Sequence, residues 1–210
     1  MARALLGASL VRDDATGGRS GRIVELEAYA GPEDQASHAR SGRTVRNAVM
    51  FGRPGIAYVY LVYGMYDCLN VVTGPEGSAS ALLVRAVEPL EGFEAMRVDR
   101  ARLAAERRRS IGRDPIGERE RLGRLPDRRL ASGPGLVGAA FGVDRTMTGV
   151  DLCDPDSPLR LEGPVGSVPE AEVVATPRIG VAYAGEPWTS RPWRLVIAGH
   201  PSASGPRSAR

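Results

Sequence analysis

Four short strand-like segments, each ended by glycine or proline, limit most strongly the folds open to this 210-residue chain. They cover residues 22–30, 56–64, 66–74 and 79–89 and are rich in Val, Ile, Leu, Tyr and Ala. The "TGPEGSAS" connection before the last segment is typical of a hairpin, so neighbouring segments should pair antiparallel. Because the chain holds 26 glycines and 16 prolines, we expect many turns and few long helices. We therefore predict an α+β fold: a single domain with a curved, mainly antiparallel β-sheet flanked by helices and long loops.

Weaker patterns place the remaining elements. Residues 90–109 predict a helix that is broken by Gly112 and Pro115 and continues as charged loop or short helix. "ALLGASLVR" reads as a helix end running into a strand, and its abrupt start at Met1 suggests that an upstream element is missing. We also expect a glycine-rich helix start at "SGPGLVGAAFGV" and short strands at "DLCD", "LRLEGP", "VVATPRIGVAY" and "WRLVIAG". One domain over residues 1–200 and a disordered tail over 201–210 complete this interpretation.

Basic residues are numerous and unevenly distributed. All 28 are arginine, which codon bias in a GC-rich genome explains most simply, and the net charge is +3. Residues 97–130 carry 12 arginines against 6 acids, and this arginine-rich stretch, centred on 102–129, either adds DNA affinity or, as we favour, serves solubility. Residues 35–53 carry four arginines and no acid, so this long loop is either a solvated surface or suited to phosphate contacts. Without lysine, no side-chain amine is available for Schiff-base catalysis.

Several classes of protein are disfavoured by the composition. No apolar run reaches the roughly 18 residues that span a bilayer, and the first residues lack a signal-peptide h-region, so we expect a cytoplasmic protein without a membrane partner. Cys68 and Cys153 lie far apart without C-x-x-C spacing, which indicates neither a disulfide framework nor a zinc site. We interpret both as buried thiols.

Two features concentrate chemically useful side chains. "YVYLVYGMY" holds four of the six tyrosines within nine positions, and in a strand Tyr58 and Tyr60 point to one face while Tyr63 has the opposite parity. These tyrosines either reflect the β-propensity of aromatic residues or offer faces on which bases stack. In "RIVELEAYA", alternation places Glu25, Glu27 and Tyr29 on the face opposite the apolar core. The two carboxylates are either a solvated strand face or, beside a nucleic acid, a source of a general base.

The run from Gly21 to Asn70, continued by "LLVRAVEPLEGFEAMR", "SGPG" and "RIGVAYAGE", resembles the alkyladenine (3-methyladenine) DNA glycosylase family. The similarity extends over nearly the whole chain. It implies a monofunctional base-excision repair enzyme that flips a damaged purine out of duplex DNA and hydrolyses its N-glycosidic bond without metal or organic cofactor. The implied partner is double-stranded DNA containing damaged purines, and the implied setting is the nucleoid of a bacterial cytoplasm. We expect a monomer.

The resemblance also implies roles for individual residues. Glu27 matches the general base that activates water for attack on C1′ of the deoxyribose. Arg85 matches the arginine that helps to hold this water near the sugar-phosphate. Tyr63 matches the wedge that enters the duplex from the minor groove.

Four further residues match the positions that bind the flipped base. Tyr29, His38 and Tyr60 match residues that sandwich and contact the extruded base. Asn70 matches the residue that disfavours the 2-amino group of guanine. Stacking on these aromatic rings can offset the few kcal/mol that flipping costs; glycosylases are among the systems for which this magnitude is already known.

Two other functions remain open from the residues alone. One is a non-catalytic nucleic-acid-binding relative, which would have no need of Glu27, Arg85 and Asn70 together. The other is a small-molecule enzyme of similar fold, which fold analogy does not exclude. The arginine-rich loop and the aromatic wedge favour a duplex as the ligand.

Overall fold

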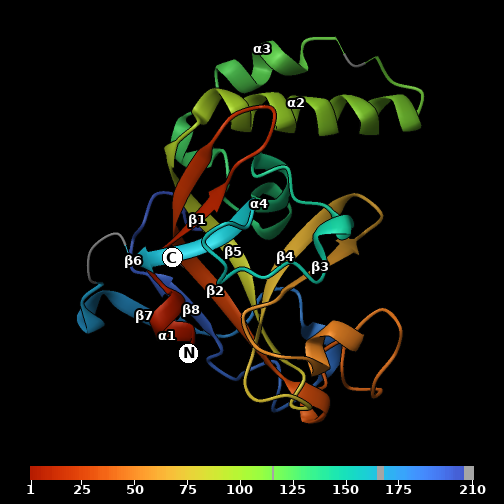
Figure 1. The fold of residues 1–210 in the computed structure, drawn as a ribbon, viewed down its shortest axis with the longest axis vertical. Helices are drawn as coiled ribbons and strands as arrows, with labels where there is room; N and C mark the ends of the chain where they lie inside the picture. Colours follow the sequence, from red (N-terminus) through yellow and green to blue (C-terminus); the bar gives the residue numbers. More distant parts are fainter. Residues whose placement is uncertain (115, 165–167, 206–210) are drawn as a thin grey trace.

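The computed structural model describes residues 1–114, 116–164 and 168–205 (Figure 1). The α-helices in these residues are α1 (Ala2–Leu5), α2 (Phe93–Ser110), α3 (Glu118–Gly123) and α4 (Pro134–Ala140). The strands are β1 (Ala8–Arg12), β2 (Arg19–Ala30), β3 (Ala57–Val62), β4 (Tyr66–Thr73), β5 (Ser80–Glu91), β6 (Leu159–Pro164), β7 (Val173–Thr176) and β8 (Arg194–Ile197).

All eight strands join one antiparallel sheet, which confirms the predicted α+β fold. Its main order is β3-β4-β5-β2-β1-β6, and β8 pairs with both β2 and β7. β5 covers one edge of β2, whereas the other edge is shared by β1, along residues 19–22, and β8, along residues 25–27. The centre of β2 is therefore enclosed by strands on both edges.

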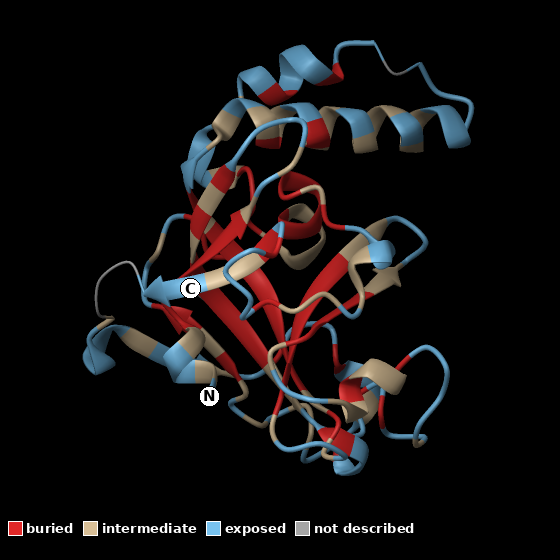
Figure 2. Ribbon diagram, in the orientation of Figure 1, coloured by how far each residue is buried: buried red, intermediate tan, exposed pale blue. Residues whose placement is uncertain are grey.

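Helix α4 packs on β4 and β5, and α2 lies on α4, so the helices form layers on one side of the sheet (Figure 1). The glycine-rich sequence of α4 allows this close contact. A Cβ atom at Gly138 would lie 2.0 Å from the carbonyl oxygen of Asp67 on β4, a distance that no other residue could tolerate. The sheet and α4 form the buried core, whereas α2 is mostly half-buried and α3 mostly exposed (Figure 2).

The arginine-rich stretch forms α2 and α3 and stands out from the core, as the predicted helix and break suggest. Only Met96 and Asp99 of α2 are buried. Asp99 ties the helix to the sheet, because its Oδ2 lies 2.9 Å from Nη2 of the fully buried Arg19 at the start of β2.

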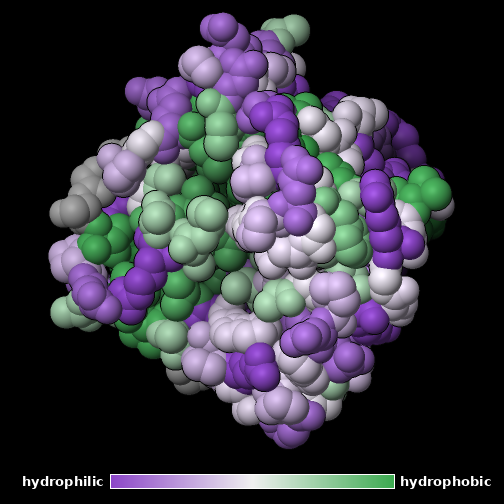
Figure 3. All heavy atoms as spheres, turned by 60° about the horizontal axis from the view of Figure 1, so that its bottom comes forward, coloured by the Kyte–Doolittle hydropathy of each residue, from purple (hydrophilic) through white to green (hydrophobic). Residues whose placement is uncertain are grey.

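None of the helices in the described ranges is long and apolar enough to cross a membrane. In Figure 3, hydrophilic side chains cover most of the lower part of the view and apolar ones gather in its left half.

The two faces of β2 depart from the predicted alternation. Glu25 and Glu27 are both fully buried, so neither belongs to a solvated strand face. The pairing of β2 with β5 shifts register on both sides of Glu25, which is a β-bulge that interrupts the period of two. Ile23 and Val24 consequently both join the core. Alternation resumes at Glu27, and the side chains of Glu27 and Tyr29 lie together.

Three other expectations are wrong. "DLCD" forms no strand, because only Asp151 makes a bridge, to Ile56. Cys153 is exposed, while Cys68 is buried and both thiols are free. Ser202, Ala203 and Ser204, expected in the disordered tail, are buried, and Ser204 contacts Glu25 in the core; residues 206–210 of that tail lie outside the described residues.

Candidate active site

An aromatic cavity opens where β2, β3 and β4 meet the loop that follows β2. Its walls include Tyr29 from β2, Tyr58 and Tyr60 from β3, Asn70 from β4 and His38 from the loop. The structure thus brings together all four residues expected to bind a base. The cavity encloses about 50 Å³, well below the roughly 300 Å³ at which ligand pockets usually begin. A purine enters only if part of the wall moves.

Tyr183 is an exposed residue of the cavity wall. It follows β7 in a short 3₁₀ turn, Ala182–Ala184, and is 63% exposed. Its hydroxyl donates to the carbonyl oxygen of Ala36 at 2.9 Å, which links the turn to the loop after β2. Sequence reasoning missed this residue, although the segment "RIGVAYAGE" that contains it contributes to the family resemblance.

The rings of His38, Tyr58 and Tyr60 contact one another. The ring centroids of His38 and Tyr60 lie 4.4 Å apart at an interplanar angle of 76°, and those of Tyr58 and Tyr60 lie 5.7 Å apart. His38 Nδ1 lies 2.9 Å from the Tyr58 hydroxyl. Desolvation of the ring, together with Arg46 and Arg40, lowers the pKa of His38 to about 4. The imidazole at the cavity's mouth is therefore neutral at physiological pH and does not repel a cationic ligand.

Asn70 reaches the same cavity from β4, where it pairs with Tyr58 of β3. It is buried, and its Nδ2 donates to the carbonyl oxygens of Tyr58 at 3.1 Å and Cys68 at 3.3 Å. These two bonds fix the plane of the amide against the cavity floor. Burial also raises the pKa of Cys68 to about 12, so its thiol stays protonated.

Glu27 lies directly behind Tyr29 and does not itself form part of the cavity wall. Its Oε2 accepts from the Tyr29 hydroxyl at 3.0 Å and lies 3.2 Å from Arg85 Nη1. Its Oε1 accepts from the backbone N–H of Ile179 at 2.7 Å. Burial and the adjacent Glu27 charge raise the pKa of Tyr29 well above its usual value, so the phenol remains a donor to the carboxylate.

Arg85 joins Glu27 to a second buried carboxylate, Glu25. Arg85 Nε and Arg194 Nε lie 2.8 and 2.7 Å from Glu25 Oε1. Burial alone would raise the pKa of Glu25, but the two guanidiniums and the Ser204 backbone N–H outweigh it, so the pKa is lowered. Burial alone would lower the pKa of Arg85, and the charges of Glu27 and Glu25 raise it instead. Glu25 and Arg85 are thus held ionised inside the sheet.

Arg178 supports the same site from the loop that follows β7. It forms a fully buried, two-point ion pair with Asp34, with distances of 2.6 and 2.9 Å. Its guanidinium also lies 4.7 Å from the centre of the Tyr29 ring. Because Ile179 follows directly, this pair holds the backbone N–H that binds Glu27. Sequence reasoning missed Arg178, Arg194 and Ser204, which become neighbours of the site only through the fold.

Tyr63 lies outside the cavity, at the tip of the β3–β4 hairpin. It is 82% exposed and has a positive φ of 52°, next to Gly64 with a φ of 64°. Positive φ at two successive residues is the type I′ pattern that suits a right-handed twisted hairpin. The predicted turn beside Gly64 is therefore confirmed, and the ring projects into solvent.

Three arginines of the loop after β2 each contact a different partner. Arg46 lies over the ring of Tyr60 at 5.8 Å, and Arg40 lies over the ring of Tyr183 at 5.3 Å. Arg53 pairs with Asp151 at 2.8 Å. Positive charge therefore surrounds the mouth of the cavity. Across the described ranges, no cluster of three or more His, Cys, Asp or Glu side chains is arranged to hold a metal ion.

Comparison with known proteins agrees with this architecture. The family described as methylpurine-DNA glycosylase (MPG) matches residues 1–201. A mouse protein named DNA-3-methyladenine glycosylase is 46% identical over 206 residues, which cover 97% of this chain and 57% of the mouse protein. A putative 3-methyladenine DNA glycosylase of Methanocella arvoryzae is 43% identical over 204 residues, covering 97% of this chain and 89% of that protein. The human DNA-3-methyladenine glycosylase is 42% identical over 206 residues, covering 97% and 63%. The chain thus spans little more than half of the mammalian proteins and most of the archaeal one, and it belongs to the methylpurine-DNA glycosylase family.

Proposed function

We propose that this protein is a monofunctional DNA glycosylase of base excision repair. It takes alkylated or deaminated purines out of duplex DNA and hydrolyses their N-glycosidic bond, leaving an abasic site. The observation that carries the proposal is the contact between Tyr29 and Glu27, which joins an aromatic cavity to a buried carboxylate. Relatives named 3-methyladenine glycosylases support the same substrate class.

The cavity has the chemistry to bind a flipped purine. Tyr29, His38 and Tyr60 offer aromatic faces, each worth roughly 1–3 kcal/mol per stacked base. The electron-rich faces of Tyr29 and Tyr60 attract the positive charge of an alkylated purine. Because His38 is neutral at physiological pH, it adds no opposing charge. The Asn70 amide, fixed by its two backbone acceptors, limits the exocyclic groups that fit at the floor.

Glu27 acts as the general base in this proposal. An ionised carboxylate has about four lone-pair positions. Three are used here, one by Ile179 N–H, one by Tyr29 and one by Arg85, which leaves a position on Oε1 for a water molecule. This water attacks C1′ of the deoxyribose while Glu27 takes its proton. The C1′–N bond breaks, and its electron pair leaves with the base, which neutralises a cationic purine.

In this proposal Arg85 orients the attacking water and places a positive charge beside Glu27. Its contacts with Glu25, Glu27 and Ser204 use one N–H each from Nε, Nη1 and Nη2, and a guanidinium has five N–H donors. The remaining donors can hold the attacking water near the sugar-phosphate. Arg85 also places a positive charge 3.2 Å from the Glu27 carboxylate.

Tyr63 is assigned to the wedge. Its exposed ring on a tight hairpin is suited to enter the base stack and occupy the space that the flipped nucleotide leaves. Strand cleavage is not expected, because the chain has no lysine to attack as an amine. Strand scission by pure enzyme, before any base or heat treatment, would contradict this part of the proposal.

The test is excision from duplexes that carry 3-methyladenine analogues, 7-methylguanine, hypoxanthine or ethenoadenine, with wild type and Glu27→Gln compared under single turnover. The amide keeps the shape of the side chain and cannot accept the proton. We expect the variant to bind damaged duplex as tightly as the wild type and to lose nearly all excision. Retained excision by Glu27→Gln would remove Glu27 from the role of base, and absence of excision by the wild type on every lesion would reject the function.

A further inference from the structure

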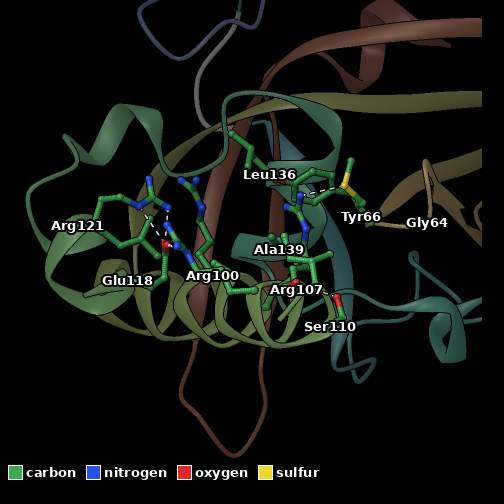
Figure 4. A pocket seen from close by; sticks show the side chains of 15 residues that line it. Gly64, Tyr66, Arg100, Arg107, Ser110, Glu118, Arg121, Leu136 and Ala139 are labelled. Atoms are coloured by element: carbon green, nitrogen blue, oxygen red, sulfur yellow. Dashed lines mark hydrogen bonds and ion pairs between the residues drawn. The ribbon is translucent and has the colours of Figure 1, made fainter. Parts of the chain in front are cut away.

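A second hollow lies between α2, α3, α4 and the β3–β4 hairpin (Figure 4). It encloses about 280 Å³ and is separate from the aromatic cavity. Its lining holds four arginines and a single acid: Arg100, Arg107, Arg108, Arg121 and Glu118. We call it the arginine hollow.

The one acid is already neutralised. Glu118 accepts from Arg108 through Oε1 and from Arg121 through Oε2, the latter at 2.7 Å from Nη2 (Figure 4). Hydrogen bonds from Arg121 and Arg108 outweigh burial and lower the pKa of Glu118, so it remains ionised. These three side chains sum to one positive charge, and Arg100 and Arg107 add two more.

Arg100 and Arg107 are held in place without a carboxylate among the described residues. Arg100 Nη1 donates to the carbonyl oxygens of Arg129 at 3.1 Å and Leu130 at 2.9 Å. Arg107 lies 4.4 Å from the centre of the Tyr66 ring, and its Nη2 is 3.0 Å from the sulfur of Met65. Both guanidiniums are thus positioned by neutral groups, and their charge is left to attract an anion.

The hairpin places this charge beside the proposed wedge. Gly64, Met65 and Tyr66 line the hollow, and the exposed Tyr63 precedes them directly. Tyr60, in the aromatic cavity, is three residues before Tyr63, which in a strand is roughly 10 Å. Helix α2 runs past the hairpin on the side away from the loop after β2 (Figure 1). A duplex that meets Tyr63 while one nucleotide occupies the cavity therefore has its backbone within reach of the hollow.

We propose that the arginine hollow binds the phosphate backbone of the duplex next to the lesion, with Arg107 as its main contact. The inference rests on the proposed function, which makes DNA the ligand. It departs from the expectation that the arginine-rich stretch serves solubility. Arginines in the last turn of a helix also interact favourably with the helix dipole, but that interaction explains neither the hollow nor the contact of Arg107 with the hairpin.

The experiment measures affinity for a short undamaged duplex as a function of salt. Each phosphate contact contributes about one unit to the slope of log K against log salt. We expect Arg107→Ala to lower the slope by about one unit, so that the advantage of wild type over the variant shrinks about threefold to fourfold between about 50 and 200 mM salt. Arg107→Lys, which keeps the charge, should retain most of the slope. The matched control is Arg124→Ala, because Arg124 directly follows α3, is exposed and lies outside the hollow.

The outcomes separate this inference from the proposed function. Equal slopes for wild type and Arg107→Ala, with both proteins folded by circular dichroism, would overturn the inference, and so would an equal loss in Arg124→Ala. Arg124→Ala should leave both the slope and single-turnover excision unchanged, because Arg124 lines neither the arginine hollow nor the aromatic cavity. The wild type could excise none of the lesions while Arg107→Ala, and not Arg124→Ala, lowers the slope of log K against log salt. That result would reject the glycosylase function and support phosphate binding by the arginine hollow.

Discussion

The hydroxyl of Tyr29 donates a hydrogen bond of 3.0 Å to Oε2 of Glu27. Through this bond, the residue that lines the aromatic cavity also fixes the carboxylate behind it. Tyr29→Phe keeps the ring and removes the bond. Since hydrogen bonds to charged groups contribute roughly 1.5–3 kcal/mol, we expect excision under single turnover to fall about tenfold or more. Affinity for damaged duplex should hardly change, and an unaltered excision rate would show that the bond does not orient Glu27.

The exposed Tyr63 allows the wedge to be tested without disturbing the core. We expect Tyr63→Ala to reduce excision from paired DNA about tenfold or more while leaving excision from single strands unchanged, because only the duplex requires the gap to be filled. Tyr63→Asn is the matched control for the turn, since asparagine tolerates positive φ and lacks the ring. Both variants should behave alike. Normal activity on duplex in Tyr63→Asn would exclude the ring from the mechanism.

The buried pair of Asp34 and Arg178 is expected to matter for stability and for the site together. Asp34→Ala leaves the Arg178 charge uncompensated in the interior, which typically costs about 3–5 kcal/mol of unfolding free energy. Replacing both residues, as Asp34→Ala with Arg178→Met, removes the charges together and should cost less than Asp34→Ala alone. Urea unfolding of the wild type, both single variants and the double variant measures the coupling. Additive losses would show that the ion pair itself contributes nothing.

The contact of Ser204 with Glu25 predicts a sharp boundary for truncation. The Ser204 N–H donates to Glu25 Oε2 at 2.6 Å, and its hydroxyl donates to Oε1 at 2.8 Å. Ending the chain after His200 removes both bonds to a buried charge and should lower the unfolding free energy by about 3 kcal/mol or more. Ending it after Gly205 keeps both bonds and serves as the control. Equal stability of the two truncated proteins would contradict the assigned role of Ser204.

The neutral His38 gives a prediction about pH. Its pKa is lowered to about 4 in the folded protein, below the usual 6.5, so the unfolded chain binds the extra proton first as pH falls. The folded state should therefore lose stability as pH drops from about 6.5 towards 4, and His38→Gln should lose less over the same window. His200, whose pKa is also lowered, contributes equally to both proteins and cancels in the difference. Identical pH dependence of urea unfolding in the two proteins would contradict the lowered pKa of His38.

Local patterns in the sequence predicted much of this fold and part of the site. Parity alone placed Tyr58 and Tyr60 on one face, and Gly64 predicted the turn that exposes Tyr63. The burial of Glu25 could not be predicted, because a β-bulge changes which face a residue occupies without changing composition. The roles of Arg178 and Ser204 could not be predicted either, because their partners Asp34 and Glu25 lie 144 and 179 positions away. Contacts at such separations are decided by the packing of the whole sheet.

The alternation of side chains in β2 after the bulge also limits where residues can be inserted or deleted. Because side chains alternate along a strand, adding or removing one residue between Leu26 and Tyr29 would turn the Tyr29 ring or the Glu27 carboxylate to the opposite side of the sheet. The long connection between β2 and β3 carries no such constraint at most of its positions. We therefore expect insertions and deletions among natural variants of this protein to collect in that connection, leaving the spacing of Glu25, Glu27 and Tyr29 invariant.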